Sequence, residues 1–135
     1  MTLKELSQLY YLNREIEIDQ QRIDELRAKA ANPSAGQLTG MPQNPTIESK
    51  LERYIAEIVD LSVIISTKQQ RCIHERNRLE RYINDIPDSL TRQIFTLRCV
   101  NGLNWVQIAA HIGGGNTELG VKQRFYRFVR KNEAD

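Results

Sequence analysis

Apolar residues of the first thirty positions recur at alternating spacings of three and four, which constrains the fold more than any other feature of the chain. Such a heptad stripe is typical of a helix that packs along a partner helix. A helix of about 28 residues would be about 42 Å long, too long to be buried along its length in a compact domain. The stripe consists of Leu9, Leu12, Ile16, Ile23, Leu26 and Ala30, with Asp19 as its polar interruption.

A second and longer heptad stripe continues to Pro87 and predicts a helix of about 40 residues. Its apolar members are Leu51, Tyr54, Ile58, Leu61, Ile65, Cys72, Leu79, Tyr82 and Ile86, and its polar exceptions are Lys68 and Glu75. The stretch 32–45 between the stripes has three of the four prolines, two glycines and no charge, so it predicts a loop. We therefore expect residues 1–87 to form a long antiparallel helical hairpin, a coiled coil.

The longer helix is expected to overhang the shorter one over residues 72–86. Its apolar residues there need cover, and the following C-terminal unit and a second copy of the chain are both candidates. Cover by both would make the protein a homodimer. A monomeric hairpin with a docked C-terminal unit remains the alternative, because heptads alone do not fix the number of chains.

Composition favours an all-α protein, and charge is unevenly distributed. The net charge of residues 1–31 is −1, that of residues 46–87 is zero and that of residues 88–135 is +3.

No apolar run approaches the roughly 20 residues of a membrane-spanning helix, so we expect no membrane segment. Two cysteines, Cys72 and Cys99, make no disulfide framework. These features predict a protein of the reducing cytoplasm.

Residues 88–135 are expected to form a separate three-helix unit. Pro87 ends the long helix, Asp88 or Ser89 caps the next one, and Asn101-Gly102 closes it. The expected buried face of this helix consists of Leu90, Ile94, Leu97 and Val100.

The last two helices of that unit have the pattern of a helix-turn-helix. Asn104 and Gln107 have the spacing of a capping box, and the residues after Asn104 share one apolar face. Three glycines, residues 113–115, end this helix because glycine readily adopts positive φ. Asn116 or Thr117 then caps the second helix. The first apolar face consists of Trp105, Ile108, Ala109 and Ile112, and the second of Val121, Phe125, Phe128 and Val129.

The opposite face of the second helix is cationic and predicts contact with double-stranded DNA. Arginine pairs with guanine, glutamine pairs with adenine, and lysine or arginine neutralises phosphates. We assign Gln123 and Arg127 to bases, and Gly120 to close approach of the backbone. The phosphate contacts are assigned to Lys122, Arg124, Arg130 and the capping Asn116 or Thr117, and Tyr126 shares the outer face. The alternative is a solvated basic face on an ordinary three-helix bundle.

Two runs carry a resemblance to a known family: residues 92–98, RQIFTLR, and residues 101–109, NGLNWVQIA. They resemble the promoter-reading module of bacterial sigma factors. With Thr39-Gly40-Met41-Pro42 in the hairpin loop, the chain is most similar to small sigma-factor-like regulators of phages and prophages of Gram-positive bacteria. That resemblance implies DNA contacts within residues 117–130, RNA polymerase as a further partner, and activation of late phage operons. The turn at residues 113–116 is two residues longer than in sigma modules.

Other functions have weaker support. The four Cys and His residues are scattered over three expected helices and lack the spacing of a structural zinc site. The triple glycine lacks the Lys-Ser/Thr of a phosphate-binding loop, and no catalytic grouping has a supporting motif. We therefore expect neither an enzyme nor a cofactor or metal. Two alternatives remain: a DNA-packaging component like the small terminase subunit, and a helical interaction protein that does not bind DNA.

Overall fold

A computed structural model describes residues 1–32 and 47–133, and over these residues the fold is all-α. The first heptad stripe forms α1 (Leu3–Leu6) and α2 (Gln8–Ala31), and the second forms α3 (Ile47–Asn84). The C-terminal elements are α4 (Ser89–Phe95), the π-helical turn η1 (Thr96–Val100), α5 (Trp105–Ile112) and α6 (Glu118–Glu133). The expected loop at 32–45 lies, from residue 33 onward, outside the described residues.

The chain divides into two compact units that differ from the expected division between residues 87 and 88. One unit comprises Arg14–Gln70, which we call the hairpin unit. The other joins Met1–Asn13 to Arg71–Asp135 and is called here the C-terminal unit. Both α2 and α3 therefore contribute residues to each unit. The sequence pattern located the helices, but it did not indicate that the first thirteen residues pack with the last sixty-five.

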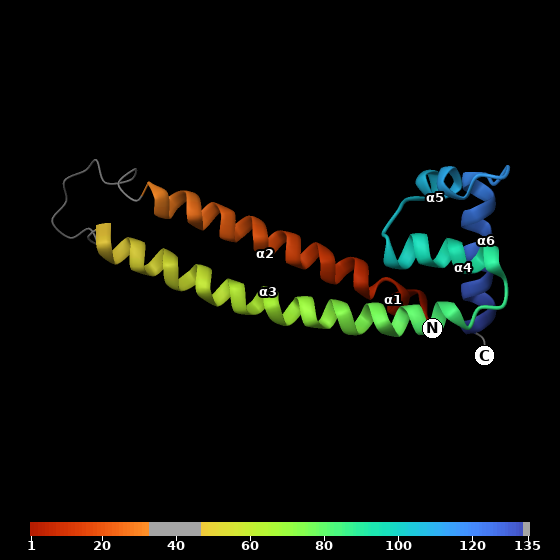
Figure 1. Ribbon diagram of the computed structural model, residues 1–135, viewed down its shortest axis with the longest axis horizontal. Helices are drawn as coiled ribbons and strands as arrows, with labels where there is room; N and C mark the ends of the chain where they lie inside the picture. The colour runs from red at the N-terminus through yellow and green to blue at the C-terminus, as the bar shows by residue number, and fades with distance from the viewer. Residues whose placement is uncertain (33–46, 134–135) are drawn as a thin grey trace. The chain divides into compact units, whose positions relative to one another are not determined.

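Within the hairpin unit, α2 and α3 run side by side in opposite directions (Figure 1). The seam between them is the expected one, since Ile23, Leu26 and Ile65 are all buried. The polar interruptions meet each other: Lys68 Nζ donates to Asp19 Oδ2 at 2.6 Å. Lys68 also lies 3.7 Å from Glu15 Oε2. The antiparallel hairpin and its heptad seam are thus confirmed for this unit.

The C-terminal unit has one continuous core that gathers residues from both ends of the chain. Leu6 of α1 and Leu9 of α2 are 2% and 4% exposed. They share this core with Leu79, Ile83 and Ile86. The expected overhang of residues 72–86 is therefore covered by the N-terminal segment and the C-terminal helices of the same chain. A second copy is not needed to bury it, so the overhang no longer supports a homodimer.

The helix after Asp88 buries a different face from the one expected. Leu90, Leu97 and Val100 are only partly buried, whereas Thr91, Phe95 and Cys99 join Ile94 in the interior. Thr96 to Val100 form a π-turn, closed by Asn101 N donating to Thr96 O at 3.0 Å. A π-turn has one more residue than an α-turn. Thr91, Ile94 and Phe95 precede this turn and recur at regular helical spacing, so spacing alone does not decide between this buried face and the expected one.

Candidate nucleic-acid interface

The capping box places the start of α5 as the sequence predicts. Gln107 N donates to Asn104 Oδ1 at 2.8 Å, and Asn104 N donates to Gln107 Oε1 at 3.0 Å. Both bonds satisfy backbone donors that the first turn of a helix leaves without partners. Trp105 and Ile108 then point inward, at 9% and 0% exposure. The first helix of the expected helix-turn-helix is thus present, with the expected inner face.

The turn between α5 and α6 depends on glycine and on two polar side chains with separate roles. Gly113 has a φ of +66°, and its N–H donates to Ala109 O at 3.0 Å. Asn116 Nδ2 donates to Gly113 O at 2.8 Å and so closes the turn. Thr117 Oγ1 accepts from Gly120 N at 3.0 Å. Of the two expected caps, Thr117 therefore occupies the N-cap position of α6, and Asn116 does not.

The inner face of α6 closes the core against α4 and α5. Val121, Phe125 and Val129 are 2%, 2% and 3% exposed. The Phe125 ring lies between two other rings, with centroids 4.6 Å from Phe95 and 5.1 Å from Trp105. Aromatic contacts of this kind add to the hydrophobic stabilisation of a core. They fix the rotation of α6 about its axis and hence which side chains face outward.

The outer face of α6 carries the predicted DNA-contacting side chains in solvent. Its exposed members are Lys122, Gln123, Arg127 and Arg130. Leu119, in the first turn of α6, is 62% exposed and lies among them. The residues that the sequence assigns to the interface do not include Leu119. The sequence does contain a signal for its exposure: Leu119 lies two positions before Val121, and helical residues at that spacing point in different directions. An apolar residue outside the buried stripe is therefore expected to face solvent.

Tyr126 lies at the edge of the outer face and is less exposed than the other predicted residues there. It is half-buried, and its ring centroid lies 5.9 Å from Trp105 and 5.3 Å from Phe125. Helical periodicity predicts the direction of a side chain, but its burial also depends on the side chains of neighbouring elements. The ring contacts with Trp105 and Phe125 account for the partial burial of Tyr126.

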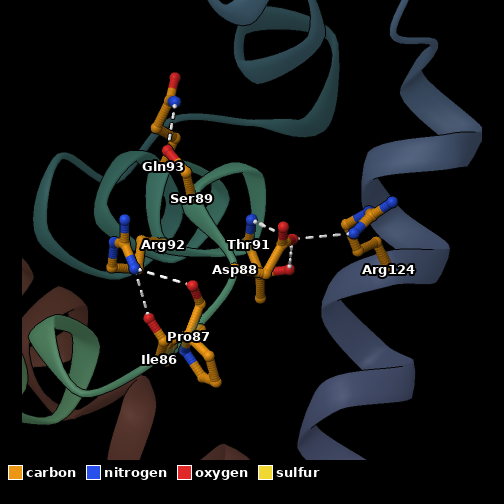
Figure 2. A network of polar contacts seen from close by, with 8 residues as sticks. All are labelled: Ile86, Pro87, Asp88, Ser89, Thr91, Arg92, Gln93 and Arg124. Atoms are coloured by element: carbon orange, nitrogen blue, oxygen red, sulfur yellow. Dashed lines mark hydrogen bonds and ion pairs between the residues drawn. The ribbon is translucent and has the colours of Figure 1, made fainter.

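Arg124 is engaged within the protein. Figure 2 shows its guanidinium directed at Asp88, and its Nη1 donates to Asp88 Oδ2 at 2.9 Å. The same carboxylate oxygen accepts from Thr91 Oγ1 at 2.6 Å and from Thr91 N at 3.0 Å. These hydrogen bonds from Thr91, with the charge of Arg124, lower the pKa of Asp88. Arg124 therefore positions α6 against the N-terminus of α4, a role that the sequence assignment to phosphate did not include.

Arg92 is a second cation of this region that bonds to groups of the same chain (Figure 2). Its Nη1 donates to Ile86 O at 2.7 Å and to Pro87 O at 3.1 Å. Two carbonyl groups of the connection between α3 and α4 thereby accept hydrogen bonds from a side chain of α4. Both Arg92 and Arg124 add to the positive charge of the unit while they fix its elements.

Gly120 has a structural role that accounts for its missing side chain. A Cβ at this position would lie 3.0 Å from Thr117 Oγ1, closer than ordinary van der Waals contact. The capping hydroxyl occupies this space. Close approach of a DNA backbone at Gly120 stays a prediction.

No other chemistry stands out among the described residues. Over residues 1–32 and 47–133, no group of three or more His, Cys, Asp or Glu side chains is placed to hold a metal ion. Within the same ranges, none of the helices combines the length and apolar character that crossing a bilayer requires.

Comparison of the chain with protein-family models, curated proteins and solved structures finds no significant match.

Proposed function

We propose that the protein is a sequence-specific DNA-binding transcriptional regulator that inserts α6 into the major groove of double-stranded DNA. The observation that carries this proposal is the division of α6 into two faces. Phe125 is buried at 2%, whereas Gln123 and Arg127 on the same helix are exposed. Side chains of these two types pair with adenine and guanine edges in the major groove.

The surroundings of α6 support the same proposal. A short helix, α5, precedes it across a glycine turn, which is the order of elements in helix-turn-helix proteins. Lys122 and Arg130 flank the proposed base-reading residues and are exposed for contact with phosphates. Residues 88–135 carry a net charge of +3, which favours binding to a polyanion.

The resemblance to sigma-factor-like phage regulators extends the proposal to its biological role. In that role the protein activates a phage promoter, with RNA polymerase as a second partner. A homodimer would present two copies of α6 to paired half-sites on DNA. These parts depend on the resemblance and on general geometry.

Affinity selection of random duplexes, followed by gel-shift titration at physiological salt, tests the central proposal. We expect the parent protein to enrich a defined sequence. Replacing both base-reading residues, Gln123→Ala with Arg127→Ala, should weaken binding to that sequence by about tenfold or more, since one bidentate pair contributes about 1–3 kcal/mol. A double variant of the hairpin unit, Gln69→Ala with Arg53→Ala, removes the same side-chain types from exposed positions of α3.

The two double variants separate specific contact from a general loss of charge. The control should bind the selected duplex as the parent does. Failure of the parent to prefer any sequence over random DNA would contradict the proposal. Equal binding by the parent and the α6 double variant would leave DNA binding intact but reject the base contacts.

Light scattering separates this role from that of a packaging component. A mass of one or two chains favours regulation, whereas a ring of many chains favours a protein like the small terminase subunit. A protein that shows neither assembly nor affinity for DNA would fit the third alternative, a helical interaction protein.

A further inference from the structure

Leu119 lines a hollow on the outer face of α6. The hollow has a volume of about 360 Å³ and is lined by Leu119, Lys122, Gln123, Tyr126 and Arg130. Single exposed leucines are common on protein surfaces. Leu119 is distinguished by its neighbours, because an exposed apolar side chain here is surrounded by two cations and an amide.

This arrangement complements the major-groove edge of an A·T base pair. Thymine presents a C5-methyl group beside its O4 acceptor, and adenine presents the N6 donor and N7 acceptor that a glutamine amide can bind together. Leu119 and Gln123 are four residues apart in a helix, so their side chains are neighbours on one surface. Lys122 and Arg130 supply the positive charge that holds phosphates on either side.

We propose that α6 reads an A·T-containing step, with Leu119 packed against a thymine methyl group and Gln123 hydrogen-bonded to an adenine of the same or the adjacent pair. This inference rests on the proposed function, since it names the DNA sequence feature that α6 recognises. It adds a specificity-determining residue, Leu119, to those assigned from the sequence. Its apolar contact distinguishes thymine from cytosine and from uracil.

Replacing thymine with deoxyuracil in the selected duplex tests the contact, because the exchange removes the methyl group and leaves the pairing edge unchanged. We expect the parent to bind the uracil duplex about fourfold more weakly for each contacted methyl group, which is the effect of one buried methyl-sized group. Leu119→Ala should bind the thymine duplex more weakly and show no further loss with uracil. Because Leu119 is 62% exposed, its removal leaves the core intact.

Two control variants make the comparison specific. Arg127→Ala should weaken binding overall but retain the parent's sensitivity to uracil. Ile18→Ala, which removes an equally exposed apolar side chain (63%) in the hairpin unit, should change neither the affinity nor the sensitivity.

The outcomes separate this inference from the proposed function. Sequence-specific binding by the parent that is indifferent to uracil, or Leu119→Ala that keeps the parent's sensitivity, overturns the thymine contact and leaves the regulator role standing. If the parent shows no sequence preference, both the thymine contact and the proposed regulator function are overturned. The thymine contact would also be rejected if the selected sequence had no A·T pair at the positions where Gln123→Ala changes the preferred base.

Discussion

Asp88 and Arg124 join α4 to α6 through an ion pair of 2.9 Å, although 36 positions separate them in the chain. Asp88 uses the same carboxylate oxygen to cap α4 through Thr91. One side chain thus stabilises the start of one helix and orients another. The placement of the proposed DNA-reading helix depends in part on this carboxylate.

Substitutions at this pair should separate capping from charge. Asp88→Ala removes both the cap and the ion pair and should lower the melting temperature most. Asp88→Asn keeps a capping oxygen and should have a smaller effect, similar to that of Arg124→Ala, since exposed ion pairs contribute little. Thermal unfolding monitored by circular dichroism measures the order of the melting temperatures. Equal melting temperatures for Asp88→Ala and Asp88→Asn would mean that the cap does not stabilise α4.

The same carboxylate should contribute to acid sensitivity. The hydrogen bonds from Thr91 and the charge of Arg124 lower the pKa of Asp88 from its ordinary value of 3.8. A group whose pKa is lowered on folding stabilises the folded state above its ordinary pKa and loses this contribution as pH falls through the lowered value. Below about pH 3.8, the stability difference between the parent and Asp88→Asn should therefore shrink. Denaturant titrations at pH 3 and pH 6 measure this difference in the free energy of unfolding. A difference that is the same at both pH values would contradict a lowered pKa of Asp88.

The N-terminal segment should be needed for the stability of the C-terminal unit. Leu6 is 2% exposed in the core that also contains Trp105. We expect Leu6→Ala to lower the free energy of unfolding by about 2–5 kcal/mol, the range for a truncated core leucine. Fluorescence of the single tryptophan reports on this unit directly. Leu3→Ala, at 43% exposure, is the matched control and should change stability by much less.

Lys68 and Asp19 should behave as a mutually dependent pair in the hairpin unit. Their side chains are 22% and 18% exposed, so neither is fully solvated. Lys68→Met alone leaves a carboxylate in the seam without its cation, and we expect a loss of about 1–3 kcal/mol. Adding Asp19→Leu should restore most of it, because an apolar pair suits a heptad seam. A double-mutant cycle by denaturant unfolding would refute this expectation if the two effects were additive.

The two cysteines should differ in reactivity. Burial raises the pKa of the Cys99 thiol to about 12, so almost no thiolate forms near neutral pH. Cys72 is only half-buried. With an aromatic disulfide reagent at pH 8, the native protein should react at Cys72 first, and at Cys99 after unfolding by denaturant. Equally fast reaction of both thiols in the native protein would show that the core around Cys99 opens readily.

Much of the fold could be predicted from the sequence where one local rule decides. The heptad seams depend on a regular period, and the start of α5 depends on a capping box of two residues. Both follow from backbone geometry alone, which is why Ile23, Ile65 and Asn104 lie where the sequence predicts.

Other features depend on tertiary partners that no local pattern reveals. Phe95 is 0% exposed because its ring packs against Phe125 and Phe128 of α6, which the spacing of residues within α4 does not indicate. Arg124 has the sequence context of a phosphate contact but pairs with Asp88. Tyr126 is half-buried, with its ring in contact with Trp105 and Phe125. The outward orientation of Gln123 and Arg127 follows from the buried stripe, and their contact with DNA remains a prediction.

The shared core of Leu6, Leu79 and Phe125 has a consequence for synthesis on the ribosome. Leu6 is translated early, but Phe125, a member of the same core, emerges much later, so this core depends on long-range packing that slows folding. Nascent chains that stall before Phe125 cannot form the unit that presents α6. Under the proposed function, abortive translation products would therefore be unable to compete for DNA with chains that contain the folded α6.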